Sequence, residues 1–276
     1  GYFYLEGIGV KKDYLKAKEY FEKSANQYNS TALYNLGAIF ESGKGVKQDY
    51  GMAFKYYSLS AKLNNPRAQN SLGIDDDTGY GIKRDYSKAM AYYILSAEQN
   101  YSYAWINLAY LYKNGVVFVK DMRIARYYYE LAAQQFNHFA YLSLGNLYAE
   151  DFKDYLKARY YYEKACEYGN TEAYFHLGDL YKKGLGVEQN YKKAKDYYEI
   201  SASYNNPNAY FELGELYKNG FGVKINYLYA KNYYEKSSEL GNPAAYFNLA
   251  EFYSNGDIND VNYEKWNDSP LLLPYE

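Results

Sequence analysis

The sequence predicts an all-α protein, built from tandem helix–turn–helix units that stack into a solenoid. Two observations lead to this prediction: a repeat of about 36 residues, and helical spacing of apolar residues inside each repeat. A leading alanine recurs every 36 residues, with one shorter step of 33, and a leucine follows it four residues later. The seven leading alanines are Ala32, Ala68, Ala104, Ala140, Ala173, Ala209 and Ala245.

The first helix of each unit has clear start and stop signals. The stretch from Ala209 to Tyr217 carries apolar residues at helical spacing, and Gly220 follows it. The glycines of the loop from Gly220 to Val223 suit positive φ at a helix end. Asparagine followed by proline predicts an N-cap and a first helical residue at three of the starts. These pairs are Asn65-Pro66, Asn206-Pro207 and Asn242-Pro243.

The second helix begins after an aspartate or asparagine that can accept hydrogen bonds from its first N–H groups. It then carries a second alanine and a tyrosine pair, as in Ala230 and Tyr233-Tyr234. The periodic placement of these tyrosines predicts that they pack in the interior. The expected capping residues are Asp13, Asp49, Asp85, Asp121, Asp154 and Asn226.

The repeated pattern is Ala-x-x-x-Leu-Gly-x-x-Tyr-x-x-Gly-x-Gly-Val, followed by Asp-Tyr-x-Lys-Ala-x-x-Tyr-Tyr. It resembles the Sel-1-like repeat, a 36-residue relative of the tetratricopeptide repeat, over roughly residues 1–266. The resemblance implies a right-handed α-solenoid that works as an interaction scaffold, and it implies no catalytic activity.

The domain prediction is a solenoid over residues 1–268, with about seven and a half repeats, and a short apolar tail over 269–276. Gly1 aligns with Gly37, which indicates that the first repeat is truncated and that the sequence is a fragment. No cellular compartment is therefore predicted. Trp266 stands where other repeats have a small alanine, which is expected if no further repeat packs there.

Two repeats depart from the pattern. The repeat at Ala140 lacks three loop residues, and the repeat at Ala68 has Asp75 and Asp76 where its neighbours are apolar. Residues 75–81 suggest a calcium loop, but the sixth and twelfth positions are Tyr80 and Tyr86 instead of glycine and a carboxylate. The better prediction is a frayed helix end whose acidic side chains lie in water.

Composition argues against several classes of function. A net charge of -2 without a basic run is atypical of nucleic-acid binding, and no apolar run is long enough for membrane insertion. Cys166 is the single cysteine, so neither an internal disulfide nor a cysteine zinc cluster is expected. His138 and His176 are far apart, and His176 is interpreted as a polar surface residue. No enzyme and no cofactor are predicted.

The predicted binding site follows from helical geometry. Counting from the leading alanine, positions +2, +6 and +9 point away from the packing residues at 0, +1, +4, +5 and +8. In tetratricopeptide-like arrays this side lines a concave groove, where aromatic anchors give affinity and charges set orientation. An alternative is that the neighbouring repeat partly buries +2 and that the charges are a solvated face. The predicted groove residues are Tyr34, Ile106, Tyr110, Leu142, Phe175, Asp179, Lys182, Phe211, Glu215, Lys218, Phe247 and Glu251.

The predicted function is a non-catalytic protein–protein interaction scaffold or adaptor, which binds a peptide or helix of another protein in its concave groove. Phe175, Phe211 and Phe247 would be its anchors. A second hypothesis is a module that binds a glycan or cell-envelope fragment by stacking on tyrosines. A third is a self-assembling structural protein, in which the tail from Leu271 to Tyr275 docks into the groove of another copy.

Overall fold

The computed structural model describes residues 1–79 and 82–255, the last three of them by their backbone alone. These residues form fifteen α-helices, one π-helical segment and no strand. The predicted fold class, an all-α array of tandem helical hairpins, is confirmed. The tail at 269–276, Trp266, Tyr80 and Gly81 lie outside the described residues. By its internal contacts the chain divides into two compact units, residues 1–135 and the residues from 136 on.

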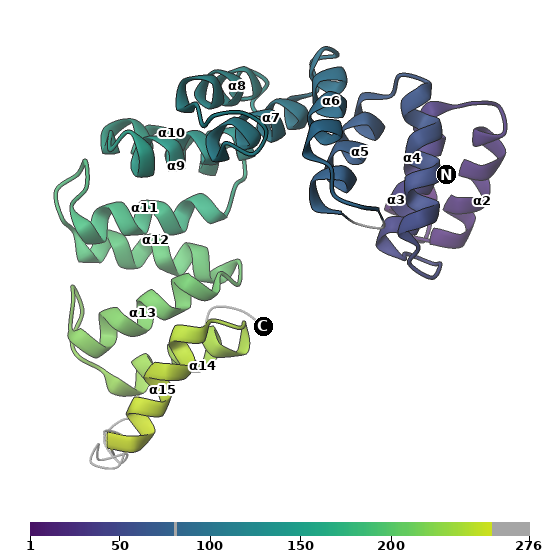
Figure 1. The fold of residues 1–276 in the computed structure, drawn as a ribbon. Coiled ribbons are helices and arrows are strands. Elements are labelled where there is room, and N and C mark those ends of the chain that lie inside the picture. The colour runs from purple at the N-terminus through teal and green to yellow at the C-terminus, as the bar shows by residue number, and fades with distance from the viewer. Residues whose placement is uncertain (80–81, 256–276) are drawn as a thin grey trace. The chain divides into compact units, whose positions relative to one another are not determined.

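The first unit contains eight helices, and each first helix packs against the second helix that follows it (Figure 1). Each second helix then packs against the first helix of the next hairpin within the unit. The helices are α1 (Tyr2–Glu6), α2 (Tyr14–Ala25), α3 (Ser30–Ser42), α4 (Tyr50–Lys62), α5 (Pro66–Thr78), α6 (Tyr86–Ala97), α7 (Ser102–Asn114) and α8 (Met122–Gln134).

The second unit repeats this arrangement, with one irregular hairpin at its start. That hairpin is the repeat with three missing loop residues, where the first helix continues into a π-helical turn, η1. The wider turn takes the place of the Gly-x-Gly loop. The elements are α9 (His138–Asn146), η1 (Leu147–Asp151), α10 (Tyr155–Glu167), α11 (Glu172–Lys183), α12 (Tyr191–Ser203), α13 (Pro207–Asn219), α14 (Tyr227–Glu239) and α15 (Pro243–Asn255).

The helix starts agree with the sequence prediction. Each of the six expected residues caps its second helix, as Asp121 does by accepting hydrogen bonds from the N–H groups of Arg123 and Ile124. Asn65 and Asn206 cap first helices whose first residue is proline. Such caps satisfy donors that have no partner inside the helix, and each typically stabilises it by about 1 kcal/mol.

In five of the described hairpins the core is a tyrosine packed against a glycine, and in the hairpin of α7 and α8 the residue at the glycine position is Ala109. The second tyrosine of each pair is at most 4% exposed. The glycine that follows the repeated leucine, five residues after the leading alanine, lies directly against that ring. A Cβ at Gly214 would come 2.6 Å from Tyr234. At these five glycines the absence of a side chain leaves room for the ring. The buried tyrosines are Tyr57, Tyr93, Tyr129, Tyr162, Tyr198 and Tyr234.

The prediction for the acidic segment is wrong. α5 runs without a break to Thr78, so Asp75 and Asp76 lie inside a helix and not at a frayed end. Their exposed fractions are 5% and 4%, so the side chains are buried rather than in water. The position in the repeat decides their burial, because they occupy slots that face the core in the other repeats.

Candidate functional site

The predicted anchors of the second unit lie on three successive first helices with different degrees of burial. Phe175 on α11 and Phe211 on α13 are half-buried against the rings of Tyr198 and Tyr234, at centroid distances of 5.8 and 5.7 Å. Phe247 on α15 is 70% exposed. The structure therefore offers one open phenylalanine on this face and two that mainly support the tyrosines beneath them.

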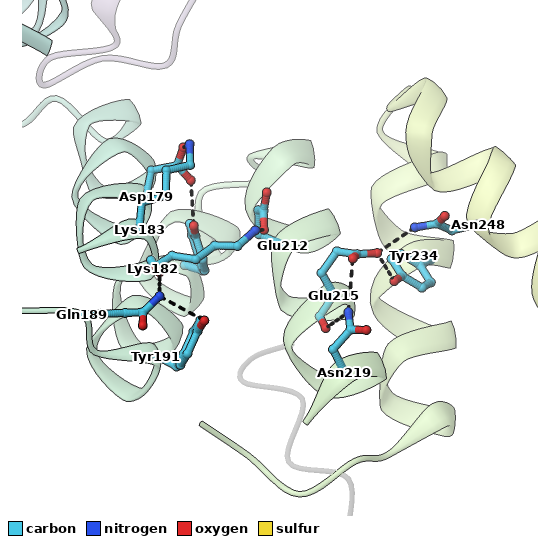
Figure 2. Close-up of polar contacts among 11 residues, drawn as sticks. Asp179, Lys182, Lys183, Gln189, Tyr191, Glu212, Glu215, Asn219, Tyr234 and Asn248 are labelled. Atoms are coloured by element: carbon cyan, nitrogen blue, oxygen red, sulfur yellow. Dashed lines mark hydrogen bonds and ion pairs between the residues drawn. The ribbon is translucent and has the colours of Figure 1, made fainter. Parts of the chain in front are cut away.

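The predicted charges form ion pairs that connect consecutive repeats. Lys182 on α11 pairs with Glu212 on α13, and Lys218 on α13 pairs with Glu251 on α15 at 3.1 Å (Figure 2 shows the first pair). Burial raises the pKa of Glu212, and Lys182 opposes this shift. The ionic partner of Lys182, Lys218 and Glu251 is thus in each case a residue of the neighbouring repeat.

Asp179 and Glu215 hold the buried tyrosines. The Tyr198 hydroxyl donates to Asp179 at 2.7 Å, and the Tyr234 hydroxyl donates to Glu215 at 2.5 Å. Asn248 of the next repeat donates to the same Glu215 oxygen at 2.8 Å (Figure 2). Burial and the nearby carboxylates raise the pKa of both tyrosines, so their hydroxyls stay protonated donors. Hydrogen bonds thus connect each buried tyrosine to a carboxylate on the first helix, and at Glu215 they extend to the next repeat.

Lys182→Met is expected to lower the free energy of unfolding of the second unit by roughly 2–3 kcal/mol, because it leaves the 18%-exposed Glu212 side chain without a counter-charge. Lys218→Met, the matched control, should cost less than about 1 kcal/mol, because Glu251 is 46% exposed. Urea denaturation followed by circular dichroism measures both. Equal losses would show that burial of the carboxylate does not set the strength of these links.

The predicted residues of the first unit are less uniform. Tyr34 on α3 is half-buried against the Tyr57 ring at 5.6 Å, and burial raises the pKa of its hydroxyl. On α7, Ile106 is half-buried and Tyr110 is 52% exposed. Tyr110 is therefore the open aromatic among the predicted residues of this unit.

Two residues of the second unit lie deeper than the helical geometry indicates. Leu142 on α9 is 7% exposed. His176 stacks on Tyr162 at a centroid distance of 5.0 Å and meets Phe175 edge-on, and burial lowers its pKa. The interpretation of His176 as a surface residue is wrong, because the face of α11 that meets α10 of the preceding repeat is also a packing face.

Sequence reasoning missed three polar residues of these junctions, Glu41, Glu212 and Asn248. Glu212 and Asn248 occupy position +3, the position of His176, which was interpreted as a polar surface position. A signal was present, since +3 is polar in most repeats, as in Ser71 and Asn107. Position +3 faces the carboxylate and tyrosine hydroxyl of the preceding repeat.

Groups suited to chemistry are sparse in the part of the chain that the structure describes. It contains no group of three or more histidine, cysteine, aspartate or glutamate side chains placed to hold a metal ion. Burial, followed by the charge of Glu163, raises the pKa of the Cys166 thiol to about 12, which disfavours a reactive thiolate. A shallow pocket of about 280 Å³ lies between α11 and α12, lined by Tyr181, Tyr197 and Ile200 among others. No described helix has the length and apolar character needed to cross a membrane.

The sequence matches the family described as "Sel1 repeat" in eight segments, residues 1–29, 30–65, 66–101, 102–135, 138–170, 171–204, 207–242 and 243–265. A Sel1 repeat protein from Oxalobacter formigenes is 31% identical, with a TM-score of 0.74, and the alignment covers 80% of this chain and 92% of that one. A protective antigen of uropathogenic Escherichia coli strains, described as displaying an SLR fold, is 31% identical with a TM-score of 0.67.

Two of these relatives are longer proteins. The alignment with the E. coli antigen covers 92% of this chain but 55% of that protein. HRD3B of Arabidopsis thaliana, described as a component of an ERAD-associated E3 ubiquitin-protein ligase, is 49% identical over 41 residues. That match covers 14% of this chain and 7% of HRD3B.

Proposed function

The chain belongs to the Sel1 repeat family, whose members are generally protein-interaction scaffolds, and from this premise we propose a non-catalytic scaffold that binds a peptide or helix of a partner protein. The binding face is formed by the first helices of the hairpins. In the second unit it comprises the outward sides of α11, α13 and α15.

The observation that carries this proposal is a pair of exposed aromatic residues on α15, a helix that hydrogen bonds hold against α13. Tyr246 and Phe247 on α15 are 58% and 70% exposed. The network of Glu215 and Asn248 ties α15 to α13 beside them. Aromatic residues on a rigid support lose little conformational entropy on binding, which is the property of interface anchors.

The internal ion pairs refine the role of the charges. Lys182 and Lys218 are already paired with carboxylates of the next repeat, so their main contribution is to hold consecutive first helices in place. A partner would therefore gain its affinity from the aromatic side chains. A charged group of a partner would find Lys182 and Lys218 already paired, so partners that place an unpaired charge on this face would be disfavoured.

Phe247→Ala is expected to weaken partner binding at least tenfold, about 1.4 kcal/mol or more, without lowering thermal stability. The chain is immobilised, partners are captured from cells of its own source, and affinity for a captured polypeptide is then measured by calorimetry. Tyr204→Ala is the matched control, because Tyr204 is 58% exposed in the same unit but lies after α12, away from this face.

Three results would contradict the proposal. Equal affinity of both variants for the captured polypeptide would remove α15 from the interface. Capture of a glycan without any polypeptide would favour the glycan-binding hypothesis. A mass of two or more chains by light scattering, with no other partner, would favour self-assembly.

A further inference from the structure

Asp75 is a buried carboxyl in a slot that is otherwise apolar. It lies at position +7 of its repeat and is 5% exposed. In the repeats that begin at the six other leading alanines, this position holds a large apolar residue exposed by 3% or less. These residues are Ile39, Leu111, Leu147, Leu180, Leu216 and Phe252. A leucine would fill the slot without burying charge, so the carboxyl needs another explanation.

The neighbours of Asp75 increase the negative charge instead of compensating it. Glu41 on α3 and Asp76 both act on Asp75 through their charges, and burial and these charges raise the pKa of Asp75 to about 7. Glu41 is half-buried and accepts a hydrogen bond from Tyr57 at 2.6 Å. The charge of Asp75 acts in turn on the hydroxyls of Tyr57 and Tyr93. Two carboxyl groups from neighbouring repeats therefore interact through their charges with each other and with Tyr57.

No basic side chain of the described residues forms an ion pair with Glu41 or Asp75, and the carboxyl group of Asp75 accepts no hydrogen bond from them. The junction of α11 and α13 in the second unit differs. There Asp179 is paired with Lys183 at 2.7 Å, and Glu212 is paired with Lys182. At that junction each carboxylate has a lysine beside it, whereas Glu41 and Asp75 have none among the described residues.

We propose that Glu41 and Asp75 form a binding site for a cationic side chain, an arginine or lysine, of the partner polypeptide. The inference rests on the proposed function, because it specifies the chemistry of the partner that the scaffold takes. An incoming cation would supply the counter-charge that lysine supplies in the second unit. It would also allow Asp75 to ionise inside the protein, since a nearby positive charge favours the charged form of a carboxyl.

The test uses a hexapeptide of alternating arginine and glycine, blocked at both ends, and the same peptide with citrulline in place of arginine. Citrulline keeps the shape and most donors but carries no charge. We expect the full chain to bind the arginine peptide at least tenfold more tightly than the citrulline peptide, by fluorescence anisotropy at low ionic strength.

Asp75→Leu and Glu41→Gln should each weaken binding of the arginine peptide at least tenfold. Asp75→Leu copies the other repeats, so the variant is expected to fold, and a thermal melt checks this. Glu98→Gln is the matched control for net charge, because Glu98 is exposed at the end of α6 in the same unit. It should change the affinity less than twofold.

Equal binding of the arginine and citrulline peptides, or unchanged binding by folded Asp75→Leu, would overturn the inference. Its failure is distinct from failure of the proposed function. A polypeptide partner whose capture depends on Phe247, together with no binding of the arginine peptide, removes only the cation site. Binding of the arginine peptide without capture of any polypeptide leaves the cation site and removes the scaffold function.

Discussion

Tyr198→Ala is expected to lower the free energy of unfolding of the second unit by about 3–5 kcal/mol, the range for truncation of a large buried aromatic side chain. Tyr198 is 0% exposed and lies between α11 and α12, where it fills the space beside Gly178. Its removal leaves a cavity. It also removes the hydrogen bond that the Tyr198 hydroxyl donates to Asp179. The two losses act on the same pair of helices.

Tyr198→Phe separates the two contributions. It keeps the ring and removes the hydroxyl, while Asp179 retains its ion pair with Lys183 at 2.7 Å. We expect this variant to cost about 1–2 kcal/mol. Hydrogen exchange of peptides from α11 and α12 measures both variants, with peptides from α3 and α4 as an internal reference. Exchange should accelerate in the second unit and stay unchanged in α3 and α4.

A double-mutant cycle with Gly178 identifies packing as the cause. A Cβ at Gly178 would lie 2.5 Å from the Tyr198 ring, so Gly178→Ala should destabilise the wild-type chain. In the Tyr198→Ala background the same change should be neutral or stabilising, because the ring is gone and alanine favours the helix. Gly51→Ala, at the exposed second residue of α4, is the control; a Cβ there would lie 3.3 Å from the Asp49 side chain, so the change should stay within about 0.5 kcal/mol in either direction. Additive effects of Gly178→Ala and Tyr198→Ala would contradict direct contact as the cause.

The repeat register could be predicted because every helix start, helix end and tyrosine recurs at the same offset. Asp121 caps its helix and Tyr198 is buried as the pattern indicates. What remained hidden was the packing between repeats. Helical geometry separates core from open face for an isolated hairpin, but the preceding hairpin covers a further part of the first helix. His176 lies in that covered part, stacked on Tyr162 of α10.

The error at Asp75 has a different physical origin. Residue chemistry favours acidic side chains in water, and that preference was given more weight than the register. The register places Asp75 at the position of Ile39 and Leu111, which are both buried. Side-chain chemistry alone is a weaker predictor than position in a repeat, because a solenoid fixes the backbone of each unit through its neighbours.

The second large effect concerns pH. In the native chain, burial and the charges of Glu41 and Asp76 raise the pKa of Asp75 to about 7, against a value near 4 in an unfolded chain. Between these two values the native state binds the Asp75 proton more tightly than the unfolded state does. The stability of the first unit is therefore expected to fall as pH rises from about 4 to about 7 and to level off above that. A shift of this size corresponds to roughly 4 kcal/mol.

Asp75→Leu isolates this contribution from that of the other carboxylates. The variant should be more stable than the parent, with a difference that is smallest near pH 4 and grows by up to about 4 kcal/mol toward pH 8. Trp105, half-buried against the core of α6 and α7, reports on the first unit. Its fluorescence is read during urea denaturation in a background where Trp266, the other tryptophan of the chain, is replaced by Phe.

Parallel pH profiles of the parent and Asp75→Leu would show that Asp75 ionises normally in the native chain. A growing difference that the arginine peptide then reduces would link the two properties of this residue. A ligand that binds the ionised native form stabilises it in proportion to its occupancy, so the peptide should raise parental stability at pH 8 and leave the variant unchanged. The buried carboxyl would then be a position where the first unit gives up packing stability in exchange for recognition of a cation.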